Sequence, residues 1–106
     1  MASVTILLIT STHETAAVWV GETVIVKLQD SATTGYRWQA EGADPAVVRL
    51  QNEDTIPGTA PGAAGVRRFE FLAVGIGQVT LRFKLRRPWE ADVPPLRQGS
   101  VDLTVK

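Results

Sequence analysis

Residues 78–86 read Gln-Val-Thr-Leu-Arg-Phe-Lys-Leu-Arg, so an apolar residue occupies every second position. Successive side chains of a β-strand point to opposite faces of its sheet. The alternation therefore predicts a strand with one buried face and one face in water. We expect the buried face to carry Val79, Leu81, Phe83 and Leu85.

The same period of two recurs along the rest of the chain, and no convincing helical period accompanies it. The other expected strands cover residues 4–10, 16–20, 23–29, 36–40, 47–51, 66–74 and 100–106. Turn-forming residues separate them, and two connections are long, over residues 52–65 and 87–98. Seven to eight short strands without a helix predict an all-β fold, an immunoglobulin-like antiparallel β-sandwich. Trp38 is expected to point inward, beneath the loop that precedes it.

The composition of the chain argues against several classes of protein function. The chain has 106 residues, so we expect a single β-sandwich domain over residues 1–106. Its formal net charge is zero, which gives no electrostatic case for binding nucleic acid or an anionic membrane. Without cysteine it has neither disulfides nor thiol chemistry. No apolar run approaches the ~20 residues that cross a bilayer.

The apolar run at residues 4–9 is also too short for the usual core of a signal peptide and lacks a basic segment before it. The sequence therefore leaves two expectations for its location. The protein is cytoplasmic, or it is secreted or periplasmic after removal of a signal peptide.

Few residues are suited to catalysis. His13 is the only histidine; it lies in a polar segment, residues 11–15, and is expected to be a solvated surface residue. It could pair with Glu14, but the sequence assigns it no third ligand and no nucleophile. Several acidic residues fall in predicted loops, where two could form a catalytic pair, namely Glu41, Asp44, Glu53, Asp54, Glu90 and Asp92. Their spacing does not favour such a pair, so an enzyme is the weakest interpretation.

Basic residues gather along and just after the strand predicted at 78–86, at Arg82, Lys84, Arg86 and Arg87. A solvated sheet face explains them most simply. The alternative is a surface for nucleic acid or an acidic partner, which the zero net charge disfavours.

Three predicted loops carry the remaining unusual residues. Residues 31–36 read Ser-Ala-Thr-Thr-Gly-Tyr, where stiff β-branched threonines precede a glycine that can adopt positive φ. Residues 62–65, Gly-Ala-Ala-Gly, form either a flexible hinge or a loop shaped for close backbone approach. Residues 87–89 are Arg-Pro-Trp, in which proline projects Trp89 from a stiff base. Trp89 either folds back onto the core or serves as a binding anchor.

In this order, the three segments resemble the loops of the chagasin family of cysteine-peptidase inhibitors. The family's first loop reads Asn-Pro-Thr-Thr-Gly-aromatic and corresponds here to Ser31, Ala32, Thr33, Thr34, Gly35 and Tyr36. Its second, Gly-x-Gly-Gly, corresponds to Gly62, Ala63, Ala64 and Gly65. Its third, Arg-Pro-aromatic, corresponds to Arg87, Pro88 and Trp89.

This chain departs from the family pattern at three positions. Ser31 forms a weaker turn than asparagine would. Ala32 loses a proline lock of about 0.4–1 kcal/mol. Ala64 costs ~1–2 kcal/mol if the family's glycine there has positive φ.

The resemblance implies a reversible, tight-binding inhibitor of papain-like cysteine peptidases, which is not an enzyme, needs no cofactor or metal and is a monomer when free. It implies that the three loops lie at one end of the sandwich and block the active-site cleft. Thr33 would lie against the target's catalytic Cys and His, with Trp89 and Arg87 gripping the cleft. The alternative is an immunoglobulin-like adhesion or ligand-recognition module.

Overall fold

The structure is a computed structural model that describes residues 4–8, 13–29, 35–58, 65–87, 89–90 and 92–106. These residues form eight strands and no helix. In chain order the strands are β1 (Val4–Leu8), β2 (His13–Val18), β3 (Thr23–Gln29), β4 (Arg37–Glu41), β5 (Val48–Ile56), β6 (Val66–Ala73), β7 (Gly77–Arg86) and β8 (Arg97–Val105).

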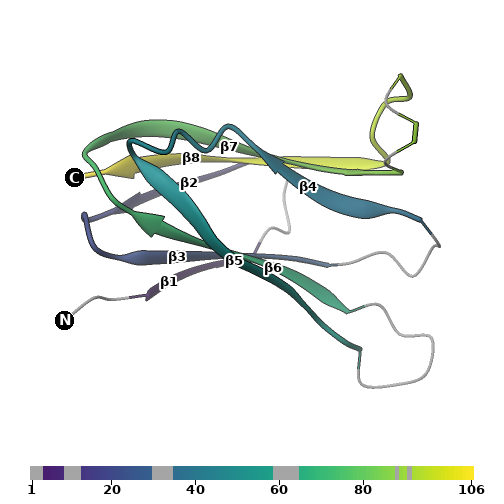
Figure 1. The fold of residues 1–106 in the computed structure, drawn as a ribbon, viewed down its shortest axis with the longest axis horizontal. Coiled ribbons are helices and arrows are strands. Elements are labelled where there is room, and N and C mark those ends of the chain that lie inside the picture. Colours follow the sequence, from purple (N-terminus) through teal and green to yellow (C-terminus); the bar gives the residue numbers. More distant parts are fainter. Residues whose placement is uncertain (1–3, 9–12, 30–34, 59–64, 88, 91) are drawn as a thin grey trace.

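The strands form two four-stranded sheets packed face to face (Figure 1). The first sheet has the order β1-β3-β6-β5 and the second the order β2-β8-β7-β4. The predicted all-β sandwich is therefore confirmed. Its pairing is not antiparallel throughout, because β1 joins β3 and β2 joins β8 in parallel. Both parallel strands are edge strands, each added to a different sheet.

Alternation in β7 produces the buried face that the sequence predicts. Val79, Leu81, Phe83 and Leu85 are all buried, and Phe83 packs between the sheets with its ring centroid 5.4 Å from that of Phe69. Each fully buried side chain of this kind stabilises the fold by about 1.5–3 kcal/mol. A core of this kind holds the sandwich together without disulfides.

Two edge strands differ from their predicted bounds. β5 runs on to Ile56, whereas the sequence placed residues 52–56 in a long loop. On the edge of the sheet its polar side chains stay exposed and pair with β6: Asp54 accepts two 2.9 Å hydrogen bonds from Arg68. β2 covers His13–Val18 and so includes part of the polar segment that was expected to be a break. An edge strand can be polar because one side of it faces water.

β8 and β4 differ from their predicted bounds by one to three residues. β8 begins at Arg97 rather than at residue 100, which shortens the connection that follows β7. β4 begins at Arg37 and ends at Glu41, one residue later at each end than expected.

The sandwich has two distinct ends. The described ends of three strand pairs, β3 and β4, β5 and β6, and β7 and β8, lie at the same end of the sandwich, opposite both chain termini (Figure 1). This end is called the loop end below. Across the described ranges, no helix has the length and apolar character needed to cross a membrane.

Candidate functional site

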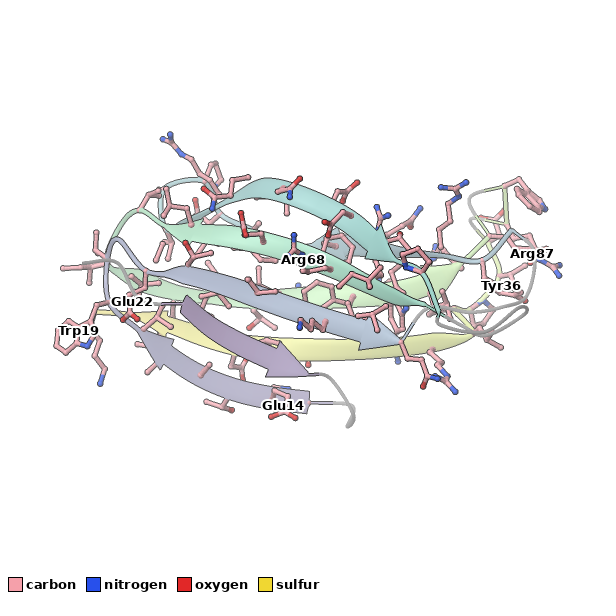
Figure 2. The ribbon with its side chains drawn as sticks, turned by 90° about the horizontal axis from the view of Figure 1, so that it is seen from below. Glu14, Trp19, Glu22, Tyr36, Arg68 and Arg87 are labelled. Carbon is pink, nitrogen blue, oxygen red and sulfur yellow. The ribbon has the colours of Figure 1, made fainter. Side chains whose placement is uncertain are left out.

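The structure describes five of the residues predicted to bind a peptidase, namely Gly35, Tyr36, Gly65, Arg87 and Trp89. All of them directly precede β4 or β6 or follow β7, at the loop end. Figure 2 shows Tyr36 and Arg87 together at this end, far from Trp19. The other predicted residues lie outside the described residues: Ser31, Ala32, Thr33, Thr34, Gly62, Ala63, Ala64 and Pro88.

Trp89 contacts the first predicted loop. Gly35 has a φ of 90°, and a Cβ built on it would lie 2.6 Å from Cη2 of Trp89. Only glycine accepts both the backbone conformation and the close approach of the ring. The indole remains 70% exposed. Of the two alternatives for Trp89, folding back into the core is therefore wrong.

A second contact joins the same two loops. The guanidinium of Arg87 lies 4.7 Å from the centroid of the Tyr36 ring, within the range of a cation–π interaction. Nη1 of Arg87 donates a 2.9 Å hydrogen bond to Glu90 Oε1. The hydrogen bond to Glu90 is the largest cause of a raised pKa of Arg87, and the nearby Tyr36 is the second. Arg87 therefore stays charged. Glu90 therefore holds Arg87 in place over Tyr36.

Sequence reasoning assigned no such role to Glu90, although it lies three residues after an arginine in a turn-forming segment. The Glu90 backbone N–H also donates to the Arg87 carbonyl oxygen at 3.0 Å. Backbone and side chain thus close one turn of the third loop.

The ends of the first loop are tied together by Trp38. This residue is buried in β4, and its Nε1 donates a 3.0 Å hydrogen bond to the carbonyl oxygen of Gln29, the last residue of β3. β3 and β4 belong to different sheets and flank residues 30–36. The predicted inward anchor is confirmed, and its indole N–H also bridges the two sheets.

Gly65 lies where the backbone is crowded. A Cβ there would collide with the carbonyl oxygen of Ile56 and lie 3.3 Å from Cα of Pro57. Close backbone approach at the start of β6 therefore requires glycine at this position.

Further apolar side chains of the third loop face solvent. Val93 is 48% exposed and Leu96 is 56% exposed. Both residues line an open pocket together with Tyr36, Arg87 and Glu90. Exposed apolar groups beside aromatic and arginine side chains are typical of a protein-binding surface. Sequence reasoning missed Val93 and Leu96 because they lay in an expected loop of mixed composition.

His13 lies at the start of strand β2, and its side chain is half exposed, as expected of a surface residue. Its Nδ1 lies 2.7 Å from Ser100 Oγ, and its Nε2 lies 3.0 Å from Asp102 Oδ2. Asp102 also accepts a 2.7 Å hydrogen bond from Thr80. The two contacts of His13 fasten edge strand β2 to β8, and the Thr80 bond joins β7 to β8.

The acidic residues considered for catalysis have other contacts. Glu53 and Asp54 pair with arginines of β6, Glu41 pairs with Lys84, and Asp44 accepts a hydrogen bond from a turn N–H. Within the part of the chain that the structure describes, no three His, Cys, Asp or Glu side chains gather as a metal site.

Known proteins share this sequence pattern and fold. Residues 17–105 match the model of the Chagasin family peptidase inhibitor I42. Amoebiasin-2 of Entamoeba histolytica is 24% identical over 110 residues, which cover 99% of this chain and 88% of that protein.

Two solved structures have a similar fold. The crystal structure of the cysteine protease inhibitor EhICP2 from Entamoeba histolytica has a TM-score of 0.88 at 21% identity, covering 99% of this chain and 97% of that one. PbICP-C, solved in complex with falcipain-2, has a TM-score of 0.71 at 15% identity, covering 96% of this chain and 99% of that one. Since the family match includes all three loop segments, the chain belongs to the chagasin family of cysteine-peptidase inhibitors.

Proposed function

We propose that this protein inhibits papain-like cysteine peptidases by inserting the loop end of the sandwich into the active-site cleft. The observation that carries the proposal is the contact between Trp89 and Gly35, which joins the first and third loops into one surface. PbICP-C, a protein of similar fold, has been solved with falcipain-2, which supports a peptidase as the partner.

The described residues of the loop end contact one another before any partner binds. Trp89 rests on Gly35, Glu90 holds Arg87 over Tyr36, and Trp38 ties the strands beneath them. A surface that is already ordered loses less conformational entropy on association, so more of the contact energy remains as affinity. This arrangement favours tight binding without a covalent bond.

The exposed side chains at the loop end are of kinds that can bind in the active-site cleft of a peptidase. Trp89 is the largest exposed side chain there, and aromatic residues with arginine commonly contribute most of the energy of an interface. Protease–inhibitor interfaces bury about 1,600 Å² in total, an area that a single end of a small sandwich can supply.

Residues 31–34 are proposed to enter the catalytic centre, with Thr33 hydrogen-bonded to the target's catalytic Cys and His. Inhibition would then arise by exclusion of substrate, with no peptide bond of the inhibitor positioned for attack. This mechanism differs from substrate-like inhibition, in which the inhibitor is slowly cut.

Titration of several papain-like peptidases with the purified protein tests the function. We expect stoichiometric, reversible inhibition, and equal or similar binding to a peptidase whose catalytic Cys is changed to Ala. Mass spectrometry after long incubation should find the backbone of residues 31–36 intact. Cleavage there would exclude the mechanism, and no inhibition of any enzyme in the panel would exclude the function.

A further inference from the structure

The outer faces of β4 and β7 carry a group of basic side chains. Inward residues such as Trp38 and Leu85 alternate with Arg37, Lys84 and Arg86, which point away from the core. Arg82 completes the group and is exposed. We call Arg37, Arg82, Lys84 and Arg86 the basic face.

The strand register brings like charges together on this face. Arg37 lies directly opposite Arg86 in the β4–β7 pair. Side chains at directly opposed positions have their Cβ atoms about 4.5–5.5 Å apart, and like charges there destabilise a sheet. The same register places Glu41 opposite Arg82, so the excess of positive charge on this face lies toward Arg37 and Arg86.

The first sheet also has two basic residues at directly opposed positions, Lys27 and Arg68, but an acidic partner lies beside them. There Arg68 forms two hydrogen bonds of 2.9 Å with Asp54, so its charge is neutralised within the sheet. On the basic face, Lys84 forms an ion pair with Glu41 at 3.4 Å. Among the described residues, no ion pair joins Arg37 or Arg82 to an acidic side chain. Across β4, β7 and β8 the outer face therefore carries four basic side chains and two acidic ones, Glu41 and Asp102.

The basic face is continuous with the loop end. Arg37 directly follows Tyr36, and Arg86 directly precedes Arg87. The pair of opposed arginines thus lies at the border between the sheet and the proposed inhibitory surface. A peptidase that receives the loops must have the rim of its cleft beside this pair.

We propose that the basic face docks against an acidic surface beside the cleft of the target peptidase, and so selects targets by charge. The inference rests on the proposed function, because the loops must first place the peptidase at this end. Complementary charges at the edge of an interface mainly accelerate association and exclude partners of like charge. Nucleic acid would also suit a basic face, but it would leave the continuity with the loop end unexplained.

The test compares two double variants with the same loss of charge. Arg37→Gln with Arg82→Gln removes charge from the basic face. Lys27→Gln with Arg49→Gln is the control, on the first sheet. The probe is a peptidase that the wild-type protein inhibits and whose cleft is bordered by acidic residues, used beside a form with those residues changed to amides.

Association rates are measured by stopped flow at low and high salt. At about 50 mM salt, we expect the basic-face variant to associate roughly tenfold more slowly than wild type, and the control variant within about twofold of it. The difference should disappear at about 0.5 M salt and with the amide form of the peptidase, since salt screens exposed charges. Melting temperatures of both variants should verify that they fold.

Each other outcome is informative. If wild type inhibits but both variants associate at the same rate, the basic face does not contact the peptidase. If the basic-face variant loses binding only to a short RNA or DNA duplex, the face is a nucleic-acid surface and the inference is wrong. If wild type inhibits no peptidase, the proposed function itself fails.

Discussion

Trp89 rests against Gly35 so closely that a methyl group on that glycine would lie 2.6 Å from the indole Cη2. The two residues belong to different loops, which follow different strands of the sandwich. The shape of the third loop therefore depends on a residue of the first loop.

Gly35→Ala should weaken inhibition by roughly tenfold or more, equivalent to ~1.4 kcal/mol of binding energy. The added methyl group displaces Trp89, and positive φ strains alanine by about 1–2 kcal/mol. Gly21 supplies the matched control: its φ is 95°, but no atom lies within 4 Å of an added Cβ. Both variants should lose similar stability in urea unfolding, and only Gly35→Ala should raise the inhibition constant. Equal inhibition by the two variants would show that the contact has no role in binding.

Trp89→Ala should weaken inhibition by ~2 kcal/mol or more while shifting the melting temperature by no more than about 2 °C. The indole is exposed in the free protein, so its removal leaves no cavity. Trp19→Ala is the control, because Trp19 is 65% exposed and lies at the opposite end of the sandwich. A large loss of stability in Trp89→Ala would instead assign the residue to the core.

Trp38→Ala should destabilise the fold by ~3–5 kcal/mol, because it removes a large buried side chain. Trp38→Phe keeps most of the ring but loses the hydrogen bond from Nε1 to the Gln29 carbonyl. Loss of that bond should lower the free energy of unfolding by about 1 kcal/mol relative to wild type. Denaturant unfolding measures both. We expect the Phe variant to fold but to inhibit less well, since the ends of the first loop are no longer tied. Unchanged inhibition by this variant would mean that the first loop keeps its shape without the tie.

Glu90→Gln should weaken inhibition a few-fold, because the charged acceptor that holds Arg87 over Tyr36 is lost. Glu41→Gln removes the charge of another exposed ion pair, that with Lys84, and is expected to affect inhibition less.

The raised pKa of Arg87 means that any stability from its charge is present at lower pH and lost only when the pH rises through that raised value. Inhibition measured from pH 5 to pH 8 should therefore show no step due to Arg87, and a step removed by Arg87→Gln would contradict this.

The central strands could be predicted from the sequence alone. Alternation in residues 78–86 determines which side of β7 is buried, because a strand with one apolar face is stable only when that face is covered. The β3 bounds, the inward Trp38 and the order of the three loop segments were likewise readable, since each depends on residues adjacent in the chain.

Edge strands and contacts between loops depended on the tertiary structure. The first half of β2 and the second half of β5 are polar, so only pairing with β8 and β6 makes them strands. Trp89 meets Gly35, and Arg37 lies opposite Arg86, because the sheets bring together residues far apart in sequence. Periodicity records which face of a segment is buried but not which segment lies beside it. That second choice is made by packing across the whole core, and it decides the geometry of the candidate site.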